Sequence, residues 1–168
     1  MRRHVFAAIV ILLLAVLETS VLPVVLGTLP RPNLVLIAAS AWAALRGDEG
    51  FIWALGGGVL LDLFSSVPFG THTAGLIIGN VLAALLNRLP LPAEFFRVTN
   101  WVAVVTIVFH SVMLMALTLA GRAFDPGRAL TTAILPLLAI NPVASLLAYA
   151  LLAPMQRRLN ELERFARS

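Results

Sequence analysis

Residues 56–70 read GGGVLLDLFSSVPFG, so a run of glycines, an acid and a Pro/Gly turn stand together inside a very apolar sequence. A carboxylate placed in hydrocarbon costs roughly 2.5–3.5 kcal/mol on insertion scales. Asp62 therefore needs a partner, a function or a position at the edge of a membrane. The segment from Ser65 to Gly70 has the residues of a tight turn and predicts a boundary between two helices.

The composition of the whole chain is that of a membrane protein. Of its 168 residues 60% are apolar and only 12% are charged, and the mean hydropathy is +0.97. A soluble domain usually carries about 25% charged residues. Inside a bilayer only helices and closed barrels satisfy the backbone. The apolar residues come in long blocks and do not alternate with polar ones as in barrel strands, so we predict an all-α, polytopic helical bundle.

Charge-free windows locate the membrane spans. The windows at 63–87, 98–121 and 129–156 each exceed the roughly 20 residues that cross a bilayer. The first span is interrupted by Glu18 and is expected to bend near Pro23. Two shorter blocks precede the first window and form either thin crossings or a re-entrant hairpin. The prediction is six spans, with five or four as alternatives, at 5–26, 33–46, 51–65, 70–88, 98–121 and 129–155.

Arginine placement sets the expected orientation. All twelve basic residues are arginines. With six spans, nine of them fall on the side of the two termini and three on the other side, which are Arg31, Arg122 and Arg128. The positive-inside rule then places both termini in the cytoplasm. Because the arginines lie at the ends of apolar blocks, they indicate contacts with lipid headgroups and not with nucleic acid.

The C-terminal residues 156–168 form the largest segment expected outside the membrane. Leu159, Leu162, Phe165 and Ala166 fall near one helical face, and arginines and glutamates occupy much of the remainder. This pattern predicts a cytoplasmic amphipathic tail that lies on anionic headgroups. A solvated, frayed tail is the alternative.

Three ionisable residues are expected together in the outer half of the membrane. Glu18 lies late in the first span, Asp62 lies near the outer end of the third, and His72 begins the fourth. A contact between the Asp62 carboxylate and the His72 imidazole would join the third and fourth spans across the turn. Polar groups of this kind hold helices together. They could equally form a pocket for a partner helix or a small molecule.

A second, deeper set of polar residues consists of Asn80, His110 and Asn141, each near the middle of its span. Pro136 and Pro142 are expected to interrupt backbone bonding in the sixth span. Broken helices can line a cavity, although neighbouring helices commonly satisfy the freed groups. A single histidine could relay protons, but no acidic residue lies near His110 in the sequence.

Small residues mark places where helices can approach closely. Gly75, Gly79 and Ala83 form a ridge on the fourth span, and Gly56–Gly58 flatten the third. Such ridges serve packing within a bundle or against another chain, and homo-oligomers are one possibility.

The sequence gives little sign of an enzyme. Cysteine is absent, which excludes disulfides and thiolate metal sites. No HExxH, GxSxG or phosphate-binding glycine loop occurs. Asp62, His72 and either Ser65 or Ser66 could be drawn as a hydrolase triad, but serine is ordinary in turns. We expect no enzymatic activity, cofactor or metal.

The order of motifs from Glu18 to about Leu86 resembles MreD, the family of bacterial rod shape-determining membrane proteins. The matching motifs are ETSVLP at 18–23, PNLVL at 32–36, LRG at 45–47, GGVLLDLFS at 57–65 and PFGTH at 68–72. The C-terminal half agrees only in hydropathy. Glu18 stands where the family more often has glutamine, and Phe69 stands where a leucine is common.

The resemblance implies a non-enzymatic scaffold of the cell-elongation machinery. Its expected partners are MreC by direct contact, the MreB filament, the glycosyltransferase RodA with its penicillin-binding transpeptidase, and membrane lipids. The family is also similar in fold to the substrate-binding subunits of energy-coupling-factor transporters, which makes a vitamin-binding subunit the alternative. The expected docking surface comprises the polar corner and the glycine seam, with Glu18, Asp62, Ser65, Pro68, Gly70, His72, Gly75 and Gly79.

Overall fold

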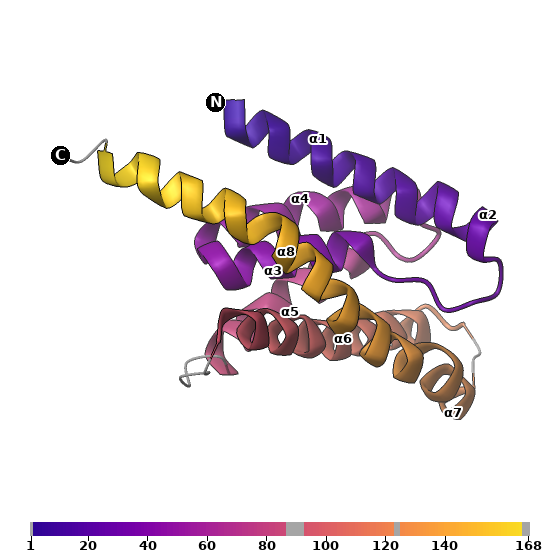
Figure 1. Cartoon of the computed structure of the whole chain (residues 1–168). Coiled ribbons are helices and arrows are strands. Elements are labelled where there is room, and N and C mark those ends of the chain that lie inside the picture. Colours follow the sequence, from indigo (N-terminus) through magenta and orange to yellow (C-terminus); the bar gives the residue numbers. More distant parts are fainter. Residues whose placement is uncertain (1, 87–92, 123–124, 166–168) are drawn as a thin grey trace.

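The described residues of the chain fold as an all-helical bundle, which confirms the all-α part of the predicted fold class. The computed structural model describes residues 2–86, 93–122 and 125–165, and no strand occurs in these ranges. The helices are α1 (Arg2–Val16), η1 (Leu17–Val21), α2 (Leu22–Leu26), α3 (Leu34–Arg46), α4 (Asp48–Phe64), α5 (Thr71–Leu86), α6 (Glu94–Leu119), α7 (Pro126–Ala129), η2 (Leu130–Ile134) and α8 (Leu135–Phe165). In Figure 1, α3 and α4 lie between α1 and the α5–α6 pair, and α8 crosses the bundle.

Helices occupy all six predicted positions, but they differ in length. Three segments are long and apolar enough to cross a membrane, namely Ala7–Leu26, Glu94–Leu119 and Gly127–Arg158. Helices α3 and α5 are apolar but shorter, with 13 and 16 residues. The window at 63–87 is therefore not one full-length span, because the turn after Phe64 divides it. Residues 87 and 88, predicted to end the fourth span, lie outside the described part.

Helix α3 is the centre of the bundle. It packs against α1, α4, α5, α6 and α8. Ten of its 13 residues are buried, from Val35 to Leu45 with the exception of Ala38. Its short side chains explain how so many helices can surround it, since alanine and serine let backbones approach closely. The sequence predicts a thin crossing or one arm of a re-entrant hairpin for this segment. In the structure it is instead the buried centre of the bundle.

Two π-helical turns interrupt the long N-terminal and C-terminal helices. Each precedes a proline by two residues, since η1 ends at Val21 before Pro23 and η2 ends at Ile134 before Pro136. A proline has no N–H and its ring clashes with the carbonyl four residues earlier, so a widened turn relieves the clash. The two segments share a pattern, LETSVLP at 17–23 and LTTAILP at 130–136. The predicted irregularity near Pro23 is confirmed as a π turn.

Helix α8 is continuous past the point where we expected a break. It contains Pro142 and Pro154 without interruption and extends to Phe165. The break expected near Asn141 is therefore wrong, and the irregular turn lies earlier, before Pro136. Residues 156–165, predicted as the start of the amphipathic tail, are helical and continue α8 without a break. The side chains proposed for the tail's apolar face, Leu159, Leu162, Phe165 and Ala166, lie outside the described part.

The far end of α8 is tied to the C-terminal end of α3. Gln156 Nε2 donates to the carbonyl of Leu45 at 3.0 Å, and Arg46 donates to Asn160 Oδ1 at 2.7 Å. Arg46 also forms an ion pair with Glu49 at 3.0 Å. The start of α1 and the end of α8 lie at the same end of the molecule (Figure 1).

Candidate functional site

The Glu18 carboxylate lies at the N-terminal end of α3. Its Oε2 accepts a hydrogen bond from the backbone N–H of Val35 at 2.9 Å, and its Oε1 accepts one from Asn33 Nδ2 at 3.4 Å. A helix N-terminus has unpaired N–H groups and a partial positive charge, so a carboxylate there is stabilised. The π turn that carries Glu18 thus supplies a cap to a helix that begins sixteen residues later in the chain.

Asn33 extends this contact to two more helices. Its backbone N–H donates to Asn141 Oδ1 at 3.1 Å, and Asn141 Nδ2 donates to Asn33 Oδ1 at 3.0 Å and to Thr106 Oγ1 at 3.2 Å. Glu18, Asn33, Asn141 and Thr106 form what we call the outer network, which joins η1, the N-cap of α3, α6 and α8. Glu18 is expected in the same half of the membrane as Asp62 and His72, but its described hydrogen bonds are with Asn33 and Val35 and not with those two residues.

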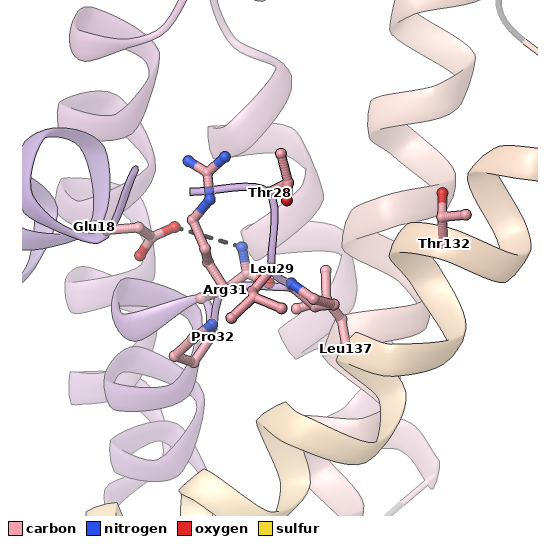
Figure 2. Close-up of a pocket in the computed structure, with 9 residues that line it drawn as sticks. Glu18, Thr28, Leu29, Arg31, Pro32, Thr132 and Leu137 are labelled. Carbon is pink, nitrogen blue, oxygen red and sulfur yellow. Dashed lines mark hydrogen bonds between the residues drawn. The ribbon is translucent and has the colours of Figure 1, made fainter. Parts of the chain in front are cut away.

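A polar cavity of about 350 Å³ opens beside the outer network. Figure 2 shows Glu18 and Arg31 on one side of it and Thr132 on the opposite side. Its lining residues are Glu18, Thr28, Leu29, Pro30, Arg31, Pro32, Asn33, Thr132 and Leu137. Glu18 and Thr132 come from the two π turns, so the repeated LxTxxLP pattern places an irregular turn on each side of one cavity.

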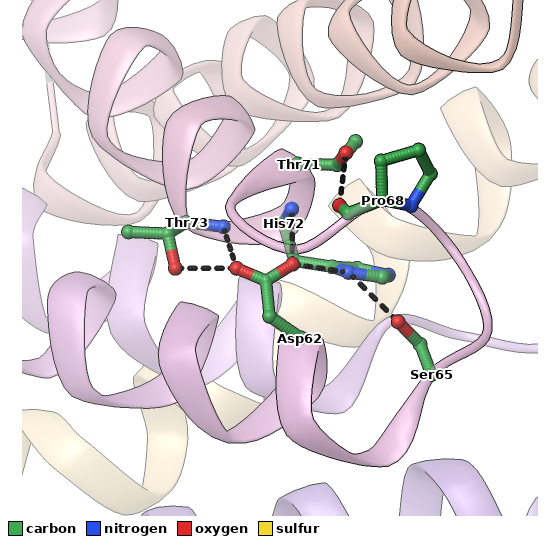
Figure 3. A network of polar contacts seen from close by, with 6 residues as sticks. All are labelled: Asp62, Ser65, Pro68, Thr71, His72 and Thr73. Atoms are coloured by element: carbon green, nitrogen blue, oxygen red, sulfur yellow. Dashed lines mark hydrogen bonds and ion pairs between the residues drawn. The ribbon is translucent and has the colours of Figure 1, made fainter. Parts of the chain in front are cut away.

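Asp62 is almost wholly buried and fully bonded at the N-terminus of α5 (Figure 3). Its Oδ1 accepts from the backbone N–H of His72 at 2.8 Å and from His72 Nδ1 at 2.9 Å. Its Oδ2 accepts from the backbone N–H of Thr73 at 3.1 Å and from the Thr73 hydroxyl at 2.6 Å. The contact predicted between Asp62 and His72 is confirmed. With four donors the carboxylate has the partners that a buried charge requires.

The Ser65–His72–Asp62 set lacks the geometry of a catalytic relay. Ser65 Oγ lies 3.4 Å from His72 Nδ1, the same ring nitrogen that contacts Asp62. In a relay the acid and the nucleophile occupy the two different nitrogens of the ring. Here Nδ1 donates to the carboxylate and does not accept a proton from serine. The arrangement serves to hold the turn.

The turn between α4 and α5 is fixed by its own residues. Gly70 has a φ of +93°, a region that residues with a Cβ rarely adopt. The Pro68 carbonyl accepts from the Thr71 hydroxyl at 2.6 Å and from the Thr71 N–H at 3.2 Å. Arg122 also donates to the Ser66 carbonyl at 2.8 Å and connects the loop after α6 to this turn.

Asn80, His110 and Asn141 do not form one deep cluster. Asn80 is buried and accepts from Trp101 Nε1 at 2.8 Å, while its amide donates to the Leu76 carbonyl at 2.8 Å and to Ser40 Oγ at 3.4 Å. Asn141 belongs to the outer network. His110 Nδ1 donates to the Thr106 carbonyl of its own helix at 2.8 Å. Asn80 therefore joins α5 to α3 and α6, and His110 bonds to its own helix.

The glycine ridge of α5 is filled by α6. A Cβ at Gly75 would meet the Phe109 ring at 2.9 Å, and one at Gly79 would meet the Val105 side chain at 3.0 Å. On α4, a Cβ at Gly58 would strike the backbone of Thr73. The docking surface expected at Gly75 and Gly79 is thus wrong, because both face a helix of the same chain. Their small size serves packing inside the bundle.

Two shallow grooves run along the sides of α1. One, of about 170 Å³, lies between α1 and α4 and is lined by Ala7, Ala8, Ile11, Ile52, Trp53 and Gly56. The other, of about 310 Å³, has residues of α1, α3, α4 and α8 as its lining: Val10, Leu14, Leu34, Ile37, Ala38, Trp53, Ala144, Leu147, Ala148, Leu151 and Leu152. We call them the α1–α4 groove and the α1–α8 groove.

Sequence reasoning missed several residues of these networks. Asn33, Ser40, Trp101 and Thr106 each bond across helices, yet none is charged and none stood out in an apolar sequence. The repeated LxTxxLP pattern could have predicted the two π turns that carry Glu18 and Thr132, on the two sides of the cavity. Within the described residues, no group of three or more histidine, cysteine or acidic side chains could hold a metal ion.

Comparisons of the chain with models of protein families, with curated proteins and with solved structures found no match. The assignment of a function therefore rests on the motifs, the networks and the grooves described above.

Proposed function

We propose that this chain is an MreD-like scaffold subunit of the bacterial cell-elongation machinery, located in the inner membrane with both termini in the cytoplasm. The observation that carries the proposal is where the resembling motifs lie. ETSVLP overlaps the first π turn and the start of α2, PNLVL begins the central helix α3, and the GGVLLDLFS and PFGTH motifs build the Asp62 corner. These four motifs thus coincide with polar contacts at helix ends, and LRG lies at the other end of α3.

The bonding of the acidic residues supports a scaffold more than a catalyst. Asp62 has four described donors and Glu18 has two. A carboxylate that caps a helix stabilises a rigid structure. A rigid bundle is what a protein needs if it is to hold the membrane helix of a partner in a fixed position.

The α1–α4 groove is the surface that best fits the single membrane helix of MreC. Ala7, Ala8 and Gly56 in its lining are small, and small residues let a second helix approach closely. A Cβ at Gly56 would meet no atom within 4 Å, so this glycine faces out of the bundle, in contrast to Gly75 and Gly79. In this proposal the MreB filament, RodA and its transpeptidase join through the same complex.

Gly56→Leu tests the partner contact without disturbing the fold. The substitution fills the groove, and overpacking costs about 1–3 kcal/mol, so recovery of MreC by co-purification should fall roughly tenfold. Ala150→Leu, at an exposed small residue of α8, is the matched control and should leave recovery unchanged. Equal recovery of MreC with wild type and Gly56→Leu would remove this groove from the interface.

The polar cavity favours one alternative function, a vitamin-binding subunit with the fold of energy-coupling-factor transporters. Its volume of about 350 Å³ falls within the roughly 300–1,000 Å³ of small-molecule sites. This alternative predicts a water-soluble small molecule bound to the purified protein and association with an ATPase module. Mass spectrometry of the extracted protein distinguishes it from the scaffold.

A further inference from the structure

The polar cavity and the α1–α8 groove adjoin along two helices. Glu18, in η1, lines the cavity, and Leu14, one turn earlier in α1, lines the groove. Asn33, the N-cap of α3, lines the cavity, and Leu34, the first residue of α3, lines the groove. The combined site therefore has a polar end of about 350 Å³ and an apolar end of about 310 Å³.

The polar end carries one charge of each sign. Arg31 is exposed, and its guanidinium has no hydrogen bond or ion pair with the residues that the structure describes. The Val35 N–H and Asn33 Nδ2 each donate to one carboxylate oxygen of Glu18, and the backbone N–H of Leu34 also faces this carboxylate. A carboxylate has about four lone-pair sites, so an acceptor remains for a cation.

The apolar end matches an acyl chain. Along α1 the groove and cavity together extend from Val10 to Glu18, which is about 12 Å at about 1.5 Å per residue. One leaflet of a bilayer has about half of the roughly 30 Å of hydrocarbon. Leu147 is 71% exposed in the wall of the groove, so the groove opens to the side of the bundle.

We propose that the site binds one zwitterionic aminophospholipid, such as phosphatidylethanolamine, with the phosphate at Arg31, the ammonium at Glu18 and an acyl chain in the α1–α8 groove. The charges decide between lipids. An anionic headgroup such as phosphatidylglycerol also satisfies Arg31, but it has no ammonium to neutralise Glu18, which then faces the lipid phosphate without a cation beside it. Phosphate prefers a guanidinium because of its paired N–H donors. This site uses other residues of α1 than the groove assigned to MreC, although Trp53 lines both grooves, and it does not rest on that proposal.

The test measures which lipid the full chain retains. Wild type is reconstituted into vesicles of equal parts phosphatidylethanolamine and phosphatidylglycerol, extracted in a mild detergent and examined by native mass spectrometry. We expect one retained phosphatidylethanolamine per chain in clear excess over phosphatidylglycerol. Equal retention of the two lipids, or retention of neither, overturns the proposal.

Two pairs of variants locate the lipid. Arg31→Gln should lower retention roughly tenfold, because it removes a charge-assisted hydrogen bond, and Arg122→Gln, outside the cavity, should not. Leu147→Asn in the groove should lower retention, and Leu146→Asn, the same change at the same depth outside the groove, should not. Neither Arg31 nor Leu147 is buried, so both variants are expected to fold. Loss of retention in both members of a pair, or in neither, contradicts the site.

Glu18→Gln tests the headgroup orientation. It removes the negative charge, so the preference for phosphatidylethanolamine over phosphatidylglycerol should disappear while total lipid retention is kept. A preference that persists in Glu18→Gln contradicts the assignment of the ammonium to Glu18. Thermal unfolding of the same sample shows whether the α3 cap is intact.

Discussion

Two carboxylates in this chain perform the same physical task. Glu18 caps α3 and Asp62 caps α5, and in both cases the acid comes from an earlier helical segment, η1 or α4, and not from the residue at the N-cap. Capping from a neighbouring helix satisfies first-turn N–H groups that would otherwise be unpaired in an apolar environment. It also ties two helices together, so one acid contributes both to local and to tertiary structure.

Removal of the Asp62 carboxylate should destabilise the protein strongly. Asp62→Ala leaves several buried donors without an acceptor and should lower the free energy of unfolding by about 2–3 kcal/mol. Thr73→Val removes only the hydroxyl bond of 2.6 Å and should cost about 1 kcal/mol. Thermal unfolding in detergent, followed by circular dichroism, measures both.

A double-mutant cycle shows whether the Thr73 hydroxyl acts through Asp62. Once Asp62 is alanine, Thr73→Val should add less than about 0.5 kcal/mol, because its acceptor has already gone. If the two costs simply add, the Thr73 hydroxyl stabilises α5 by some other contact, and the description of this corner is incorrect.

At the scale of the element, α3 explains why length alone is a poor guide in this chain. It has 13 residues, about 20 Å at about 1.5 Å per residue, which is short for a lipid-exposed span. Other helices surround it, so it has no need to match the bilayer thickness by itself. Its N-terminal end is bonded by Glu18 and Asn141, and its C-terminal end by Gln156.

The central position of α3 makes its small residues sensitive to size. Ala39 is fully buried, and Ala39→Leu should lower the free energy of unfolding by about 1–3 kcal/mol through overpacking. The same substitution at Ala150, exposed on α8, should change it by less than about 0.5 kcal/mol. Thermal unfolding of the two variants in one detergent compares them directly. A similar Tm for both would mean that α3 is not packed on all sides.

At the scale of the whole molecule, apolar composition was enough to predict an all-helical bundle, and charge-free windows placed its helices. The Asp62–His72 contact also followed from the sequence, because ten residues and a Pro/Gly turn bring the two side chains together. The hydrogen-bond partners of Glu18 could not be predicted from the sequence. Its network includes Asn141, 108 residues away from Asn33, and uncharged side chains give no pattern that pairs distant helices. The glycines of α5 also did not indicate whether the helix packed against them would belong to the same chain or to a partner.

The number of crossings is the prediction with the widest consequences for this molecule. Helix α4 has 17 residues, about 26 Å at about 1.5 Å per residue, and local thinning of the bilayer can accommodate this length. If α4 crosses, Glu49 and Ser66 lie on opposite sides of the membrane, with Glu49 in the cytoplasm as the arginines indicate. If α3 and α4 form a re-entrant hairpin, Glu49 does not reach the cytoplasmic side.

The chain has no cysteine, so Glu49→Cys and Ser66→Cys each introduce a single thiol without background. In intact cells a membrane-impermeant maleimide should label Ser66→Cys and leave Glu49→Cys unlabelled until the membrane is opened. Labelling of both in intact cells would exclude six crossings.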